Sequence, residues 1–208
     1  MFGLDDFSKR KRNKIAVDFA LFMPDISAEN YVSLGRFTET ILDDFKKSLY
    51  FFLEKELVTE FICLILPPQL FAAKDFVSTI EPWFKWKGFA TRATACMKFK
   101  AGLKTNDVRP GWGFVWILAR KPALRLHAVF DDVLFPPPEI ADSLQWDYIF
   151  KRLLRSFCRP KGCVYFDPVT LRPDLVRSLI RVGDAEEKKV VVPDTTLTWV
   201  KENWRNNR

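Results

Sequence analysis

The feature that most constrains the fold of this chain is a stretch of three successive β-like runs. They cover residues 88–99, 112–120 and 123–135. Turn residues at 104–107 and 121–122 separate one run from the next. Short connections join antiparallel strands, whereas parallel strands need a crossover of about a dozen residues or more. The pattern therefore predicts an antiparallel β-meander over about 88–135.

Helical periodicity surrounds this stretch. The clearest helix has apolar residues at spacings of three and four, at Leu34, Phe37, Ile41, Phe45, Leu49 and Phe52. Other helices are expected over 69–80, around 146–157, from Arg172 to a glycine cap at Gly183, and over 195–204. Apolar runs at 15–23, 59–66, 163–166 and 189–192 predict further strands. Amphipathic helices packed around a meander indicate an α+β fold.

The domain organisation is expected to be simple. Residues 1–14 are polar and rich in lysine and arginine, which predicts a basic, mobile arm. Residues 15–208 are expected to form a single α+β domain. The three prolines at 136–138 are either a rigid loop or a subdomain boundary.

Composition narrows the class of protein. Of the 208 residues, 48% are hydrophobic, which is ample for a packed core, and only 8 are glycine, which argues against glycine-rich phosphate loops. No apolar run reaches the roughly 18 residues of a membrane span. Cys63 and Cys96 lie in apolar runs, which predicts reduced, buried thiols and a cytoplasmic or nuclear location.

Most enzyme chemistries lack their usual residues. His127 is the one histidine, and its place in an apolar run (ALRLHAVF) favours a structural role. A Ser-His-Asp triad would depend on it, and no G-x-S-x-G motif is present. Cys158 and Cys163 (CRPKGC) have a spacing that suggests a metal knuckle, but structural zinc needs four ligands. The sequence predicts no catalytic residue, no cofactor and no metal, and leaves zinc at these two cysteines open.

The order of two short motifs resembles that of the amino-methyltransferases. An apolar run ends in two prolines (FICLILPP), and much later a helix and a second apolar run end in Asp167-Pro168 (CVYFDP). Those enzymes carry an Asp-Pro-Pro-aromatic catalytic turn and a later Asp-Pro-Phe followed by glycines. Here Leu66 and Gln69 replace the acid and the aromatic residue, and the glycines after Pro168 are absent. The resemblance covers two tetrapeptides, assigns no family, and implies a degenerate scaffold without methyl transfer.

Positive charge gathers on one predicted helix. The net charge of the chain is +7, and no acidic residue lies between Ile149 and Lys161. The cations of this region are Lys151, Arg152, Arg155, Arg159 and Lys161. Like charges four residues apart on a helix repel, so a chain that keeps them is expected to use them for an anionic partner.

A second region interleaves rings with cations over 82–87 (PWFKWK). Rings that stack on bases, with cations that hold phosphates, are typical of single-strand binding. The alternative is that the rings anchor the core while the lysines face solvent. The nucleic-acid-binding residues expected in and after this region are Trp83, Trp86, Lys85, Lys87, Arg92, Lys98 and Lys100.

These patterns favour a non-enzymatic nucleic-acid-binding protein, a subunit of a nucleoprotein complex, with DNA or RNA as its partner. The main alternative is a protein–protein interaction subunit or adaptor, which docks through exposed tryptophans. The second alternative is the degenerate methyltransferase-like scaffold.

Overall fold

The fold is built on one mixed sheet. The computed structural model describes residues 2–3, 17–23, 43, 45–49, 52, 60–66, 74–98, 112–120, 126, 128–168 and 173–193. The strands are β1 (Phe2–Gly3), β2 (Phe19–Phe22), β3 (Phe61–Leu66), β4 (Phe89–Lys98), β5 (Trp112–Arg120), β6 (Val133–Leu134), β7 (Cys163–Asp167) and β8 (Lys189–Val192). The helices are α4 (Lys74–Trp86), α5 (Gln145–Phe157) and α6 (Pro173–Ala185), with the 3-10 turn η2 (Asp142–Leu144). Residues 45–49 are also helical.

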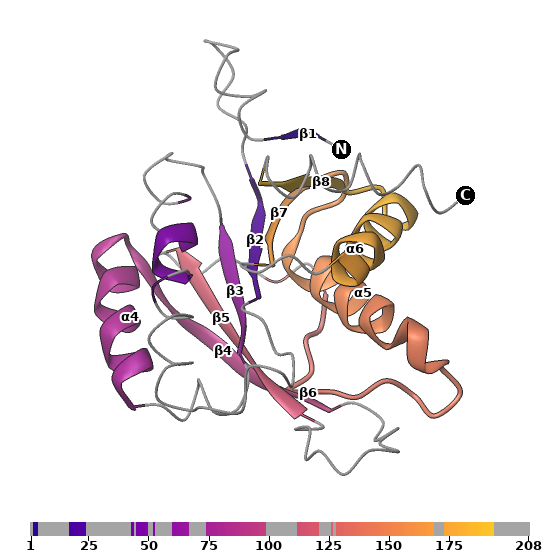
Figure 1. Cartoon of the computed structure of the whole chain (residues 1–208), viewed down its shortest axis with the longest axis horizontal. Coiled ribbons are helices and arrows are strands. Elements are labelled where there is room, and N and C mark those ends of the chain that lie inside the picture. Colours follow the sequence, from indigo (N-terminus) through magenta and orange to yellow (C-terminus); the bar gives the residue numbers. More distant parts are fainter. Residues whose placement is uncertain are drawn as a thin grey trace.

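The sheet is mostly parallel. Its strand order is β1-β8-β7-β2-β3-β5-β4-β6 (Figure 1). Strands β1, β8, β7, β2 and β3 pair in parallel. Beyond β3 the sheet continues with β5 and β4, each antiparallel to its neighbour, and ends with β6, which is parallel to β4.

The predicted antiparallel meander is wrong as a description of this sheet. Two of its runs are strands, since β4 covers 89–98 and β5 covers 112–120. Among the described residues of the third run (126 and 128–135), only Val133–Leu134 form a strand, and this strand pairs in parallel with β4 rather than antiparallel with β5. Strand β5 instead pairs with β3, which lies far earlier in the chain. Local turn signals show where strands end, but they do not show which distant strand lies alongside.

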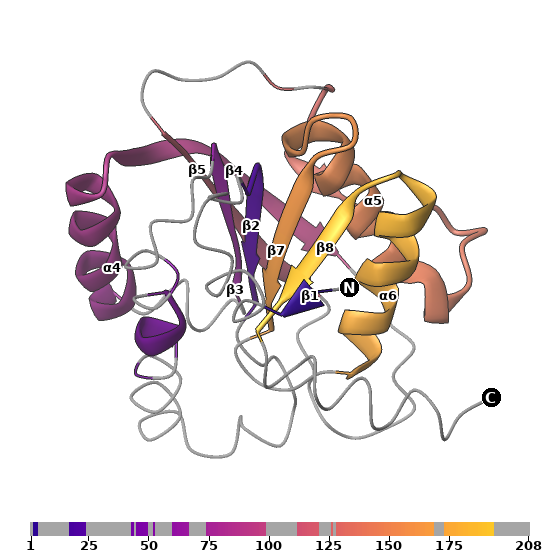
Figure 2. The same cartoon turned by 90° about the horizontal axis from the view of Figure 1, so that it is seen from above.

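Helices cover both faces of the sheet, so the architecture is mixed α/β with helices outside and the sheet between. Figure 2 shows α5 and α6 on one side of the sheet and α4 on the other. The central strands β2 (FALF), β3 (FICLIL) and β7 (CVYFD) are buried along their whole length. Apolar runs without alternation are typical of strands covered on both faces.

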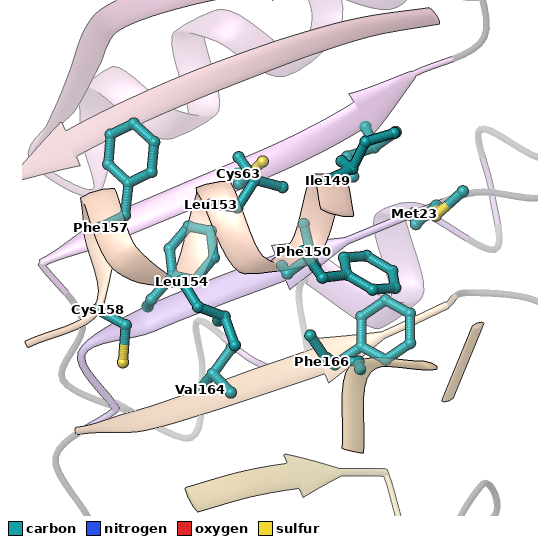
Figure 3. Packing of buried hydrophobic residues seen from close by; sticks show 14 of the residues in the cluster. Met23, Cys63, Ile149, Phe150, Leu153, Leu154, Phe157, Cys158, Val164 and Phe166 are labelled. Carbon is teal, nitrogen blue, oxygen red and sulfur yellow. The ribbon is translucent and has the colours of Figure 1, made fainter. Parts of the chain in front are cut away.

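The larger core lies under α5. Phe150, Leu153 and Phe157 of this helix are fully buried, and Trp146 is half-buried against them. The predicted amphipathic helix is therefore confirmed. Figure 3 shows its apolar side chains lying over β2, β3 and β7, next to Met23, Cys63, Val164 and Phe166.

The second core lies under α4 and the 45–49 helix. Phe45, Leu49 and Phe52 are fully buried in it, as their spacing predicts, and Ile80 and Phe84 of α4 join them. Helix α4 runs to Trp86, beyond the predicted end near Ile80, and is followed by Gly88 with φ 83°, a left-handed conformation that glycine favours.

Helix α6 does not end at Gly183 as predicted but continues to Ala185. A Cβ at Gly183 would lie 2.5 Å from the Cγ2 of Val190 on β8. This glycine is therefore needed for close packing between helix and strand rather than for a cap. Strand β8, at Lys189–Val192, matches its prediction.

Some expectations concern residues outside the described part of the chain. They are the first half of the 34–52 helix, Lys100, His127 and the 195–204 helix. Of the basic arm at 1–14, only Phe2 and Gly3 are described, and they pair with β8. No helix in the described residues is long and apolar enough to cross a membrane.

All four cysteines are free thiols, as predicted. Cys63, Cys158 and Cys163 are buried. Cys96 was expected to be buried as well, but it is exposed, because its side chain points away from the core while those of Ala95 and Met97 are buried in it.

Candidate functional site

The topology creates a switch point at the carboxyl edge of the sheet. From β7 the chain crosses to β8 on one side, whereas β2 is followed by β3 on the other, so the strand order diverges between β7 and β2. Ligands of open α/β sheets bind outside the carboxyl ends of the strands at such a switch point. Phe22 and Asp167 are paired at this edge, and the amide of Met23 donates to the Asp167 carbonyl oxygen at 2.9 Å.

Asp167 is the acidic side chain at this switch point. Its residue is 8% exposed, and its Oδ2 accepts hydrogen bonds from the hydroxyl of Ser48 and from the hydroxyl of Tyr165 at 3.1 Å. A buried carboxylate needs such donors because desolvation of an unpaired charge is costly. Asp167 precedes Pro168, where turn residues are common, but its burial at the switch point favours a site role over a simple turn.

Aromatic rings pack below this carboxylate. The ring of Tyr165 stacks on Phe52 at 4.8 Å between centroids, and Phe22 lies 5.3 Å from Phe52 and 5.6 Å from Tyr165. These side chains are fully buried. These rings thus pack together on the face of the sheet that carries Asp167, and Ser48 links the 45–49 helix to that carboxylate.

The structure changes where the methyltransferase resemblance lies. Leu66, before the two prolines, ends β3, which is one strand removed from the switch point. The residues that face Asp167 are Phe22 and Met23, at the end of β2. Both side chains are buried and apolar, so neither is an acid that accepts a proton. Asp167-Pro168, in contrast, does follow the strand at the switch point.

The basic stripe on and just after α5 is held in ion pairs. It consists of the cations of Lys151, Arg155 and Arg159. Glu186, after α6, lies 3.7 Å from the Nζ of Lys151 and 2.8 Å from the Nε of Arg155. The hydrogen bond from Arg155 is the main cause that lowers the pKa of Glu186, and the pKa of Arg155 is raised by the same bond. The cations remain about half exposed, but Glu186, just after α6, offsets the repulsion within the helix.

Arg159 and the other cations near α5 also have defined surroundings. The Nε of Arg159 lies 2.6 Å from an oxygen of the buried Asp18, and Arg152 pairs with Asp131. Lys161 is exposed in a left-handed turn with φ 55°. Asp18 precedes β2 and pairs with Cys163 at the start of β7, so this corner is the amino edge, opposite the switch point.

The interleaved segment at 82–87 forms the last turn of α4 and the residue after it. Phe84 is core, Trp83 is half-buried, and Trp86 is 73% exposed. Lys85 pairs with Glu81 at 3.0 Å, and the Nζ of Lys87 lies 4.4 Å from the centroid of the Trp86 ring. Phe84 thus anchors the core, as one reading expects, whereas nucleic-acid binding by the exposed Trp86 stays a prediction.

The predicted nucleic-acid-binding residues do not form one surface. Lys85, Lys87, Trp83 and Trp86 lie on the α4 side of the sheet, and the stripe on α5 lies on the other side (Figure 2). Arg92 and Lys98 are exposed on β4 between them, and the Nζ of Lys98 lies 5.7 Å from the ring centroid of Phe135.

The sequence analysis missed residues that the tertiary structure brings next to Asp167 and to the tryptophans of α4. Lys46 and Lys47 line a groove with Trp83 and Trp86, and Ser48 reaches Asp167 across 119 residues of sequence. No local pattern marks these contacts. In the described part of the chain, no cluster of three or more histidine, cysteine or acidic side chains is arranged to hold a metal ion.

Comparisons with known proteins find likeness at the level of structure. No family model and no curated protein matches the sequence. The structure of M1.HpyAVI in complex with SAM is similar at 12% identity and a TM-score of 0.57, with 96% of this chain and 92% of that chain covered. The PvuII cytosine-N4-specific DNA methyltransferase is similar at 10% identity and a TM-score of 0.59, with 88% and 76% covered.

These comparisons overturn the predicted class of function. The non-enzymatic nucleic-acid-binding protein is not what the fold indicates, because the similar structures are of methyltransferase enzymes. They agree better with the methyltransferase-like alternative. The switch point at Asp167 therefore lies in a Rossmann-like fold that is similar to the folds of these DNA methyltransferase structures.

Proposed function

We propose that this chain is a methyltransferase-type protein that acts on nucleic acid and binds an adenosyl cofactor at the edge between β7 and β2. The observation that carries the proposal is Asp167, a buried carboxylate at the switch point of a methyltransferase-like sheet. The net charge of +7 supports a polyanionic substrate. The free thiols support a cytoplasmic or nuclear location.

One residue at this edge, Asp167, has the chemistry to bind the cofactor. An adenosyl cofactor such as S-adenosylmethionine carries hydroxyl and ammonium groups, and a carboxylate that already accepts hydrogen bonds from two hydroxyls suits such donors. Asp167 would therefore hold it. Asp194, two residues after β8 in the sequence, is a second candidate acceptor, because an acid after the following strand binds the ribose in many dinucleotide sites. When bound, the cofactor would supply an electrophilic methyl group.

Within the described residues, the end of β2 does not match the transfer turn of the amino-methyltransferases. Phe22 and Met23 face Asp167 where a proton acceptor would be needed, and residues 168–172 contain no glycine for close backbone approach. This observation favours a second candidate function, a degenerate methyltransferase-like scaffold that keeps the binding edge without amino-methyl transfer.

Two measurements test these candidates. Titration calorimetry with S-adenosylmethionine should show binding that Asp167→Asn weakens by about tenfold or more, because a hydrogen bond to a charged group contributes about 1.5–3 kcal/mol. Asp147→Asn is the matched control, since Asp147 also accepts from a serine hydroxyl, Ser178, but lies on α5 away from the edge.

The second measurement is methyl transfer from tritiated S-adenosylmethionine to single- and double-stranded DNA and RNA. Transfer to any of them supports an active enzyme. Cofactor binding without transfer supports the degenerate scaffold. A folded protein that binds neither S-adenosylmethionine nor S-adenosylhomocysteine overturns both candidates.

A further inference from the structure

A groove with a tryptophan floor lies between the 45–49 helix and α4. It encloses about 720 Å³ and is lined by Lys46, Lys47, Thr79, Ile80, Trp83 and Trp86, here named the tryptophan groove. Figures 1 and 2 both show the 45–49 helix beside α4. Its volume is within the range of about 300–1,000 Å³ that small-ligand sites occupy.

The exposed ring of Trp86 is the unusual part of this groove. Tryptophan is rarely left in water because its large ring stabilises a protein most when buried, yet Trp86 is 73% exposed. Trp83 and Ile80 of the same helix are held by the core beneath it, so α4 presents the ring on a rigid support. An exposed, rigid aromatic ring is the basic element of a stacking platform.

Lysine side chains lie around the Trp86 ring, and their charge favours an anionic ligand. Lys46 and Lys47 enter from the neighbouring helix, and the Nζ of Lys87 lies 4.4 Å from the Trp86 centroid. Protein–protein interface cores are enriched in aromatic residues but depleted of lysine. Rings bordered by lysines instead match a base with its flanking phosphates. Glu81 is already paired with Lys85, at 3.0 Å, which reduces its repulsion of an incoming phosphate.

The groove also lies on the face of the sheet that carries the Asp167 side chain. Ser48, next to Lys47 in the 45–49 helix, donates its hydroxyl to Asp167. The same short helix thus lines the groove and contacts the carboxylate at the switch point. A strand bound in the groove would be held on the side of the sheet that carries the Asp167 side chain.

We propose that the tryptophan groove binds single-stranded nucleic acid, with one unpaired base stacked on Trp86 and the adjacent phosphates held by Lys46 and Lys47. The inference rests on the nucleic-acid part of the proposed function and names the substrate-binding surface for it. It assigns the α4 side of the sheet, rather than the α5 side, as the surface that contacts the strand.

The test is the fluorescence anisotropy of a short labelled oligothymidylate at several salt concentrations. Trp86→Ala should weaken binding by about 5- to 150-fold, which corresponds to the roughly 1–3 kcal/mol of one base–aromatic stack, and should leave the salt slope unchanged. Trp86→Phe keeps a ring and should retain most of the affinity. An unaltered affinity in Trp86→Ala overturns the proposal.

The lysines should change a different quantity. The double variant Lys46→Ala, Lys47→Ala should reduce the magnitude of the log–log salt slope by about 1.4, since each phosphate contact on a single strand contributes about 0.7. Lys151→Ala, on the opposite side of the sheet, is the matched control and should leave the slope as it is. Equal slopes in the double variant and the wild type contradict the proposal.

The remaining outcomes separate this inference from the proposed function. If the wild-type protein binds S-adenosylmethionine but no oligonucleotide at low salt, the proposed role of the tryptophan groove is wrong and the proposed cofactor site is supported. If oligonucleotide binding depends on Trp86 but no cofactor binds, the proposed role of the groove is supported and the proposed methyltransferase function is contradicted. If Trp86→Ala abolishes self-association in sedimentation and changes no oligonucleotide affinity, a second copy of the chain occupies the groove and the proposal is wrong.

Discussion

Arg159 holds the buried carboxylate of Asp18 at the amino edge of the sheet, with its Nε 2.6 Å from Oδ1. The other oxygen of this carboxylate accepts a hydrogen bond of 2.6 Å from the amide of Cys163. The side chain of Asp18 is only 4% exposed, so it depends on these donors for the solvation it has lost. Arg159 is therefore positioned by a buried acid, although the sequence predicts it as a phosphate contact.

Arg159→Ala should destabilise the protein. Removing one partner of a fully buried ion pair costs about 3–5 kcal/mol, and because Arg159 is itself 57% exposed, a discounted loss of about 1–2 kcal/mol is expected. Urea denaturation measures it. Arg177→Ala on α6 is the control, since no acidic partner of Arg177 is found among the described residues, and it should change the free energy of unfolding by less than about 0.5 kcal/mol. Equal losses in the two variants would refute the structural role of Arg159.

Gly183→Ala should destabilise the protein by about 1–3 kcal/mol, the usual cost of overpacking. In an exposed helix interior the same change stabilises by about 0.5–1 kcal/mol, so the expected sign is the reverse of the helix preference. The reason is the 2.5 Å approach of the new Cβ to Val190. Adding Val190→Ala removes the opposing methyl groups, and thermal unfolding of the double variant should therefore show a smaller loss than the sum of the two single changes. Strict additivity would show that the contact is not the cause.

The Glu186 cluster predicts a pH dependence of stability. The hydrogen bond from Arg155 lowers the pKa of Glu186 below its ordinary value of 4.5. A lowered folded-state pKa means that the stabilisation is present above about pH 4.5 and is lost as the pH falls through the folded-state value. Glu186→Gln should therefore be less stable than the wild type by up to about 1 kcal/mol near neutral pH, and the difference should shrink in acid.

Urea denaturation from neutral pH down through this range measures the difference. Glu187→Gln makes the same substitution at the exposed neighbouring residue and is the control. A gap between wild type and Glu186→Gln that stays constant through the acid range would contradict the assignment.

The thiols should differ in reactivity. Burial raises the pKa of Cys158 to about 12 and that of Cys163 to about 11, and it also raises the pKa of Cys63. Because the thiolate is the reactive form, only the exposed Cys96 should react rapidly with a disulfide reagent in the native protein. A thiol count of one in the native state and four in denaturant is expected, and Cys96→Ser should remove the fast phase. A second fast thiol would place one of the other cysteines at the surface.

The sequence by itself determined most of the local elements. The spacing of Phe150, Leu153 and Phe157 determines which face of α5 is buried, and the uninterrupted apolar run of β3 marks a strand covered on both faces. Such patterns depend on neighbours within a few residues, so they are visible in one dimension. The free, buried thiol of Cys63 likewise followed from its apolar run, whereas the exposure of Cys96 did not.

Only the tertiary structure decided how the elements are arranged and what the charges do. The parallel order around β7 and β2 depends on crossovers between distant segments, which places Asp167 opposite Met23 and within reach of Ser48. The sequence has no acid between Ile149 and Lys161 to offset the basic stripe, but Glu186 and Asp18 are brought to it from elsewhere in the chain. Long-range pairing is set by the packing of whole faces, and no local spacing contains that information.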